Sequence, residues 1–286
     1  MKAIFATDLR PSAESTRALL TGLAWPAGTT LEVLHVLPLR RSAFFGPARA
    51  PTEETLALTR DRLSAVAAGI AERLQAQRVT VHDTTRVGDA AGEIVRRAEE
   101  IRADLVIIGS PRRDGLIYLG SVATSLIDRA PCSVLIARTE AVGRLLLADD
   151  GSPSADVAAE VIGRWPMFSS LPVAVVSVLD MNIPVLAGPH SQFEQPVELS
   201  EPIRARASEL VDRRVAQLRS SGRLVQGLIR EGAAATELLR ASRILSIDLL
   251  VLGCSSRFGL TRLLLGSVAR SVVLESDRSV LIARAS

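Results

Sequence analysis

The sequence predicts two tandem α/β domains, each an open, parallel, five-stranded sheet of the Rossmann-like or flavodoxin-like kind with helices on both faces. Its 286 residues suit two domains of ordinary size. Short apolar segments alternate with segments of helical periodicity, which is typical of parallel strands joined by right-handed crossovers. Hydrophobic residues make up 48% of the chain and aromatic residues only 3%, as expected for aliphatic strands buried on both faces.

An internal repeat divides the chain between residues 139 and 143. The order of the repeated segments is kept, and their offset changes only from 144 to 146 residues. Chance similarity between apolar strands would not keep the glycines in register, so we predict domains at residues 1–139 and 140–286. The repeated segments, each followed by its copy, are 104–110 and 248–254, 120–123 and 266–269, and 133–138 and 279–284.

Each half contains the segments needed for five strands. The predicted strands are Ala3–Ala6, Leu31–Leu37, Val79–Val81, Leu105–Ile108 and Val134–Ala137 in the first half, and Leu145–Ala148, Val173–Leu179, Leu224–Ile229, Leu249–Leu252 and Val280–Ala283 in the second. Helices are predicted over Ser12–Leu23, Leu56–Leu74, Ile94–Ile101 and Ile203–Leu218. Segments 38–51 and 180–202 fit no regular element, and we interpret them as surface excursions rather than functional loops.

Composition argues against several classes of function. The net charge is +3 and no run of Lys or Arg exceeds a pair, so nucleic-acid binding is not expected. No stretch of about 18 apolar residues predicts a membrane span, and the first residues do not resemble a signal peptide, so we expect a cytoplasmic protein. Cys132 and Cys254 lie in different halves and predict neither a disulfide framework nor a metal site.

The strongest chemical signal is the segment between Gly253 and Val268. It begins where a buried strand ends and runs into a helix near Gly266. In open parallel sheets, ligands bind beyond the carboxyl ends of the strands. Glycines allow close approach of the backbone, the free amides at a helix start attract anions, and Ser267 adds a hydroxyl. This arrangement predicts a phosphate site.

A second motif, Asp149-Asp150-Gly151-Ser152, follows the first strand of the same half. Consecutive strand residues point to opposite faces, so the two aspartates are a poor acid/base pair. We expect Asp150 to face the ligand cleft, where it could accept a hydrogen bond from a ribose or adenine. The alternative is that Asp150 or Ser152 caps the next helix, and the two roles are compatible.

These motifs resemble the universal stress protein family, whose ATP motif is G-x2-G-x9-G-[ST] and whose first strand is followed by Asp-Gly-Ser. The second half has G-x2-S-x9-G-S and Asp150-Gly151-Ser152. The resemblance covers both halves and implies an adenine nucleotide alpha hydrolase-like fold that binds ATP, with or without Mg²⁺. Because Ser256 replaces a glycine, we expect binding to be weakened rather than abolished.

The resemblance also implies roles for individual residues. Asp150 would contact adenosine, the backbone of Val178 would contact adenine, and Gly253 would lie against the ribose. The phosphates would be held by Ser256, Gly266, Ser267 and Val268, and the predicted binding set also includes Gly151, Ser152 and Arg257.

The first half departs further from this pattern. Leu9 stands where a glycine would follow Asp8, Pro111 removes an amide donor, and Arg112 replaces the second glycine. The loop between the last two glycines is two residues shorter than in the second half. We therefore predict a degenerate first site without ATP, where Arg112 and Arg113 either reach an anion or form a solvated loop.

Function is predicted at the level of binding. The leading hypothesis is a stress-response regulatory protein that binds ATP or another adenine nucleotide and acts through an unknown protein partner. It is not expected to be an enzyme, because no phosphate-loop lysine motif or set of nucleophile, base and orienting residue occurs. The alternatives are a scaffold that binds no nucleotide, and a slow ATPase using Asp149 or Asp150 with Mg²⁺.

The family resemblance also implies how the halves associate. Family members commonly pair through their last strands. We therefore expect Val134–Ala137 and Val280–Ala283 to pair within the chain as an internal pseudo-dimer, with a homodimer as a further arrangement. His35 and His82 lie in apolar strands, which favours core positions over ligand contacts.

Overall fold

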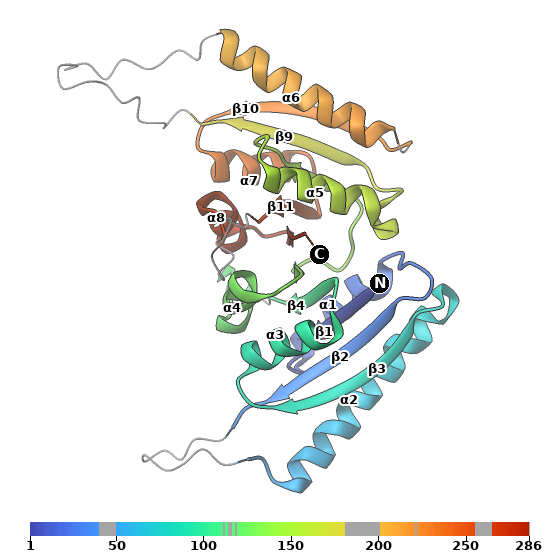
Figure 1. The fold of residues 1–286 in the computed structure, drawn as a ribbon. Coiled ribbons are helices and arrows are strands. Elements are labelled where there is room, and N and C mark those ends of the chain that lie inside the picture. Colours follow the sequence, from blue (N-terminus) through green and yellow to red (C-terminus); the bar gives the residue numbers. More distant parts are fainter. Residues whose placement is uncertain are drawn as a thin grey trace, which may run out of the picture.

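The protein is built around one continuous ten-stranded sheet (Figure 1). The computed structural model describes residues 1–39, 50–110, 112–113, 116–117, 119–180, 201–220, 222–254 and 265–285. The strand order is β10-β9-β8-β11-β12-β7-β4-β1-β2-β3, so each half contributes five neighbouring strands. In the ten-stranded sheet, all pairings within each half are parallel. The parallel α/β prediction is therefore confirmed.

The two predicted sheets are joined at the centre. Strands β7 and β12 pair antiparallel, with Val280 opposite Ile136 and Ile282 opposite Val134. This confirms the pairing of last strands that the resemblance implied, and it turns two five-stranded sheets into one. The first-half strands are β1 (Lys2–Ala6), β2 (Thr30–Leu37), β3 (Thr80–Val87), β4 (Leu105–Gly109) and β7 (Ser133–Ala137). The second-half strands are β8 (Leu145–Ala148), β9 (Val173–Leu179), β10 (Val225–Glu231), β11 (Leu249–Gly253) and β12 (Ser279–Ala283).

Helices cover both faces of the sheet, and each face has its own apolar layer. One layer contains side chains from α1 (Glu14–Gly22), α2 (Glu53–Leu74), α5 (Pro153–Arg164) and α6 (Glu201–Arg219). The other contains side chains from α3 (Ala90–Ile101), α4 (Ser121–Arg129), α7 (Ala234–Ile244) and α8 (Ser267–Glu275). Both layers continue across the seam between the halves. None of the described helices is long and apolar enough to cross a bilayer.

Some elements differ from the predictions in extent. Strand β3 has eight residues rather than the three predicted, because its polar residues from His82 onward still pair with β2. His82 is exposed rather than buried in the core. A two-stranded hairpin, β5 (Arg112–Arg113) with β6 (Leu116–Ile117), was not predicted. Segments 40–49 and 181–200, most of the two predicted excursions, lie outside the described residues.

The seam is held by two arginines related by the pseudo-twofold symmetry of the halves. Arg284 donates to carbonyl oxygens at the end of α4, including that of Ala130 at 2.6 Å. Arg138 donates in the same way to the end of α8, to the carbonyls of Val273 (2.7 Å) and Ser276 (2.9 Å). The negative end of each helix dipole therefore meets a guanidinium from the other half.

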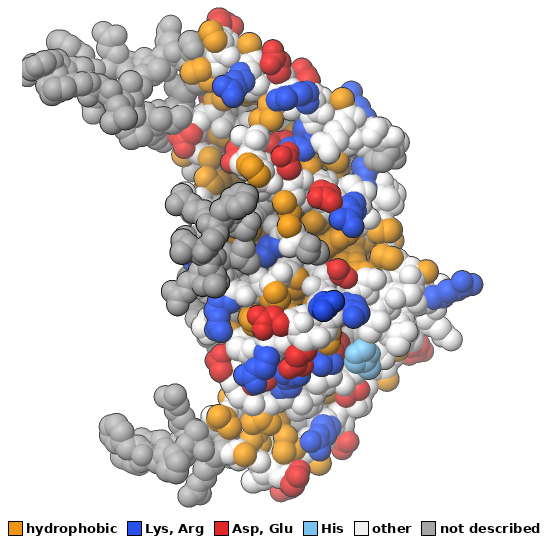
Figure 2. Space-filling view, viewed as in Figure 1, with side chains coloured by type: hydrophobic (Ala, Val, Ile, Leu, Met, Phe, Trp, Pro, Cys, Tyr) orange, Lys and Arg blue, Asp and Glu red, His pale blue; other side chains and the backbone are white. Residues whose placement is uncertain are grey.

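Basic and acidic side chains are interspersed on the face drawn in Figure 2. One cluster centres on Glu32, a buried carboxylate on β2. Arg97 on α3 binds it with Nε and Nη2 at 2.8 and 2.9 Å. Glu100 in turn accepts hydrogen bonds from Arg86 and Arg97. Burial alone would raise the pKa of Glu32, but the hydrogen bonds from Arg97 and Thr84 together with the positive charge of Arg97 outweigh it, and the pKa is lowered.

This cluster predicts a loss of stability in acid. Hydrogen bonds from Arg86, then from Arg97, lower the pKa of Glu100 from 4.5 to about 2. A carboxylate with a depressed pKa in the folded state stabilises the protein above its unfolded pKa, and this contribution is lost as the pH falls toward 2. Urea denaturation at several values between pH 5 and pH 2 should show stability falling across this window. The unfolding free energy should fall less steeply with pH in Glu100→Gln. An unchanged dependence on pH would contradict the lowered pKa of Glu100 in the folded protein.

Candidate functional site

A cavity of about 360 Å³ opens at the carboxyl ends of β8, β9 and β11, beside the start of α8. Seven of the predicted binding residues line it: Asp150, Ser152, Val178, Gly253, Gly266, Ser267 and Val268. Gly151 does not line it. Ser256 and Arg257 belong to segment 255–264, which lies outside the described residues. Residues that were predicted from the sequence and lie more than 100 positions apart along the chain thus line the same cavity.

The turn after β8 separates the two aspartates as the strand alternation predicted. Asp150 is exposed, and its Oδ1 accepts a hydrogen bond from the Ser152 amide at 2.9 Å. The Ser152 hydroxyl accepts one from the Ala155 amide at 3.3 Å, so Ser152 is the N-cap of α5. The second oxygen of Asp150 has no partner among the described residues. It remains available to a donor such as a ribose hydroxyl.

Asp149 points away from solvent and is paired with α6. Its Oδ2 lies 2.6 Å from Nε of Arg214, and its Oδ1 accepts a hydrogen bond from the Gly151 amide at 3.0 Å. Both side chains of the pair are at most 8% exposed. Burial alone would lower the pKa of Arg214, but its hydrogen bonds to Asp149 and Asp156, together with the negative charges of these carboxylates, outweigh it, and the pKa is raised. Both oxygens of Asp149 therefore already have a partner within the protein.

The start of α8 supplies backbone donors. Gly266 is the N-cap residue and carries no side chain that could cap the helix. The first helical hydrogen bond runs from the Arg270 amide to the Gly266 carbonyl at 2.9 Å. The amides of Ser267, Val268 and Ala269 precede that bond and have no acceptor among the described residues. Together with the helix dipole, they form a site suited to a phosphate.

Gly253 has a structural reason to be glycine. A Cβ at this position would lie 1.8 Å from the carbonyl oxygen of Ser154, in the first turn of α5. The backbone of α5 therefore approaches β11 so closely that no side chain fits. The contact with a ribose remains a prediction, and the close approach explains the glycine without it.

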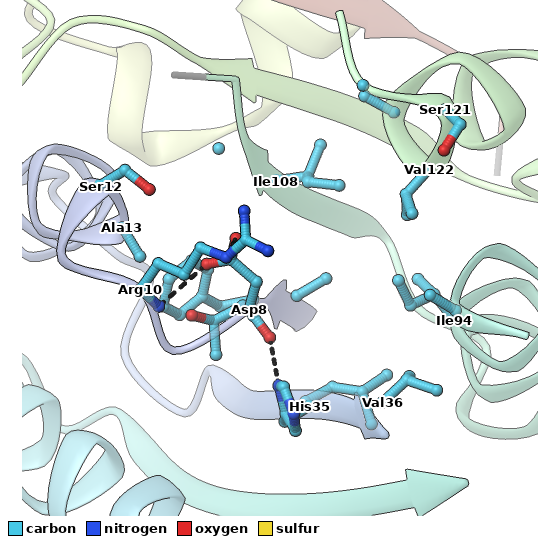
Figure 3. Close-up of a pocket in the computed structure, with 18 residues that line it drawn as sticks. Asp8, Arg10, Ser12, Ala13, His35, Val36, Ile94, Ile108, Ser121 and Val122 are labelled. Carbon is cyan, nitrogen blue, oxygen red and sulfur yellow. Dashed lines mark hydrogen bonds and ion pairs between the residues drawn. The ribbon is translucent and has the colours of Figure 1, made fainter. Parts of the chain in front are cut away.

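The first half contains an equivalent cavity of about 420 Å³ (Figure 3). Every residue that lines the second cavity has a counterpart lining the first. Four backbone hydrogen bonds, each from an amide to a carbonyl oxygen, recur in both halves and establish this correspondence. Each first-half bond is given with its second-half copy: Thr7 to Leu34 with Asp149 to Val176; Gly88 to Leu37 with Gly232 to Leu179; Ser110 to Ala137 with Cys254 to Ala283; and Thr124 to Gly120 with Arg270 to Gly266. The first half therefore has the cavity despite the departures seen in the sequence.

Three polar or charged side chains distinguish the first cavity from the second. Arg10 occupies the position of Ser152, and its guanidinium lies across the cavity beside Asp8, with Nε 3.5 Å from Oδ2 (Figure 3). Thr7 replaces Asp149. His35 lines the cavity rather than the core, with Nδ1 2.8 Å from the Thr7 carbonyl oxygen. Neither Arg10 nor His35 was predicted from the sequence to line a site. Their equivalence to second-half residues becomes visible only when the strands are placed in register.

The side chains of the first candidate loop, Arg112 and Arg113, lie outside the described residues, as do Pro111 and Gly115. Their two predicted alternatives, an anion contact or a solvated loop, remain predictions.

The chemistry of the second cavity fits an adenine nucleotide. Val176, Val178, Leu238 and Leu252 give it an apolar middle, where a flat ring system can be buried. The unpaired amides at the start of α8 suit phosphate, and Asp150 suits a hydroxyl or amino donor. Among the described lining residues, only Asp149 and Asp150 are titratable.

The family model described as "Universal stress protein family" matches the chain twice, over residues 1–138 and 142–284. The chain belongs to the universal stress protein family. This confirms the resemblance and its tandem, two-domain form.

Known universal stress proteins are similar to this chain in sequence and in fold. One from Mycobacterium tuberculosis is 29% identical over 199 residues, and the match covers 64% of this chain and 63% of that protein. The chain therefore matches less than two thirds of the length of that relative. A crystal structure from Archaeoglobus fulgidus superimposes with a TM-score of 0.70 at 17% identity, covering 99% of this chain and 98% of that one.

A putative universal stress protein from Pseudomonas aeruginosa superimposes with a TM-score of 0.62 at 19% identity, covering 99% of this chain and 92% of that chain. At these identities the structural similarities show the fold alone.

Proposed function

We propose that this universal stress protein binds one adenine nucleotide, ATP in particular, in the cavity of its second half, and that it acts as a regulatory binding protein in a stress response. The observation that carries the proposal is the uncapped start of α8 at a largely apolar cavity that Asp150 also lines. Bound nucleotide would favour one conformation of the protein, which a protein partner could then recognise.

The proposal is for binding without catalysis. Asp149 is occupied by Arg214 and by the Gly151 amide, which leaves Asp150 as the one lining carboxylate that could orient water. Backbone amides hold a phosphate well, but they do not activate a nucleophile. Slow hydrolysis would require Asp150 with Mg²⁺, and no further residue in the described lining supports it.

A substitution at Gly266 separates binding from folding. Gly266 has φ −59° and ψ 156°, and a Cβ there would meet nothing within 4 Å. In Gly266→Asp, the carboxylate should cap the α8 amides and raise stability by up to about 1 kcal/mol. The same carboxylate would occupy the proposed phosphate position and repel the nucleotide. We therefore expect a more stable protein that no longer binds ATP.

Thermal unfolding with and without millimolar ATP measures this. Saturation of the wild type at about 100 times Kd adds roughly 2.7 kcal/mol of stability, which is about 5 °C or more for a domain of this size. Gly266→Asp should show no such shift. The matched control is Gly120→Asp, because Gly120 is the N-cap of α4 with nearly the same backbone angles, φ −62° and ψ 157°. It should keep the full shift.

The outcomes distinguish the candidate functions. No shift in the wild type, with or without Mg²⁺, would refute nucleotide binding and favour a scaffold that acts only through protein partners. Loss of the shift in Gly120→Asp instead of Gly266→Asp would place the site in the first half.

A further inference from the structure

The turn at residues 149–152, which lines the second cavity, is held against α6 at two points. Gly151 adopts a φ of +74°, and a Cβ there would lie 3.1 Å from Leu210 of α6, so Leu210 packs directly on the turn. One helical turn further along, Arg214 pairs with Asp149. Helix α6 lies over β9 and β10 and beside α5 (Figure 1). It therefore packs behind this turn.

The carboxylate of Asp149 connects α6 to the backbone of the turn. Asp149 accepts from Nε of Arg214 through Oδ2 and from the Gly151 amide through Oδ1. Arg214 also contacts Asp156 on α5 and donates to Oε1 of Gln217 at 2.8 Å. The arginine thus links the end of β8 and the first turn of α5 to α6. A charged pair in a buried environment is held more rigidly than a neutral hydroxyl.

The first half shows that the fold does not require this pair. There the hydroxyl of Thr7 accepts from the Leu9 amide at 3.1 Å, so the same turn forms without a carboxylate. Buried positions in α2 recur at Ala67, Ile70 and Leu74, with the spacing of Val211, Arg214 and Leu218 in α6. The first half therefore has Thr7 and Ile70 where the second half has Asp149 and Arg214.

We propose that Arg214 is a positioning residue of the second cavity. It fixes the turn at residues 149–151 in one conformation, and through that turn it places Asp150 and Ser152 at the ligand. A buried ion pair is rarely the most stabilising choice for a core, because apolar side chains of similar volume often serve as well. Since the first half folds with the apolar alternative, rigidity of the ligand-binding turn is the property that the pair adds. The effect on nucleotide affinity rests on the proposed function, whereas the fixing of the turn does not.

The test introduces the two first-half residues, Thr7 and Ile70, at the corresponding positions of the second half. Asp149→Thr combined with Arg214→Ile should fold with a Tm near that of the wild type, because no buried charge is left unpaired. Asp156 also loses its arginine, but its side chain is 66% exposed and remains solvated. In the nucleotide-free protein, hydrogen exchange at the Gly151 amide should become at least tenfold faster. The Kd for ATP, measured by titration calorimetry, should rise at least tenfold. Arg214→Lys keeps a charge but loses the fork of donors, so both values should be intermediate.

A control on the same helix separates this effect from a general loss of charge. Arg204→Ile removes an exposed ion pair between α6 and Glu231, and it should change neither exchange nor affinity. Wild-type exchange and wild-type affinity in the double variant would overturn the proposal. If the wild type itself binds no ATP, the proposed function fails, and the exchange rate at Gly151 alone decides whether Arg214 fixes the turn.

Discussion

Gly253→Ala should lower the free energy of unfolding by about 3 kcal/mol or more, the upper range for an overpacked core. The added Cβ would lie 1.8 Å from a backbone oxygen of α5, and no rotation of a side chain can relieve a contact with backbone. Helix α5 must therefore move away from β11, and the Asp150 turn must move with it. Urea denaturation measures the loss of stability, and loss of ATP binding should accompany it.

The control for this variant is Gly266→Ala, at the other end of the predicted phosphate motif. A Cβ at Gly266 meets nothing within 4 Å, so the cost is limited to the weaker N-cap preference of alanine, about 1 kcal/mol or less. Equal destabilisation by the two variants would show that α5 does not approach β11 as closely as described here.

Arg284→Met should lower the free energy of unfolding by about 3 kcal/mol. The guanidinium is buried at the seam and donates to several carbonyl oxygens at the end of α4. Methionine fills much of the volume but leaves those carbonyls without donors, at a cost of about 1–3 kcal/mol for each buried group that loses its hydrogen bond. Because these bonds join the two halves, the urea transition should also become less cooperative.

Two control variants provide reference values for the loss of stability expected in Arg284→Met. Arg138→Met removes the pseudo-symmetric arginine, which is only partly buried, and should cost less because water can reach its carbonyl partners. Arg164→Met removes an arginine that is 76% exposed and paired within α5, and it should change stability by no more than about 0.5 kcal/mol. A cost for Arg284→Met as small as that for Arg164→Met would contradict a structural role at the seam.

Local pattern was enough to predict most of the fold. The central strands are continuous apolar runs, so Leu105–Ile108 and Leu249–Leu252 were identified directly. Strand β3 was predicted too short because it is the last strand at one end of the sheet, where polar residues such as His82 are tolerated. That the two halves share one sheet does not follow from periodicity. The prediction that the halves pair through their last strands came from the family resemblance, and the pairing of β7 with β12 confirms it.

The candidate site was predictable where it follows a strand or a helix start. Alternation predicted that Asp149 and Asp150 point to opposite faces, and the structure has Asp150 exposed and Asp149 buried just after β8. The partner of Asp149 could not be predicted, because Arg214 is 65 residues away and appears in sequence as one more helical arginine. Arg10 and the first cavity were missed for a related reason. A departure from a motif shows that a position has changed, but not whether the space around it has closed.

The two cavities therefore share a framework and differ in charge. Each has a carboxylate, Asp8 or Asp150, and a helix that starts at a glycine without a side-chain cap. The second also has a turn that is paired with α6 through Asp149 and Arg214. The first has an arginine lying across it and a turn in which Leu9 adopts a φ of +59°, a conformation that costs a residue with a side chain about 1 kcal/mol or more. These differences favour the second half as the nucleotide site.

Native mass spectrometry of the purified protein mixed with ATP tests the central claim most directly, because it counts bound nucleotides per chain. One nucleotide is predicted for the wild type and for Gly120→Asp, and none for Gly266→Asp. A wild-type chain that carries no nucleotide, or a Gly266→Asp chain that still carries one, would contradict the claim that the start of α8 holds the phosphates.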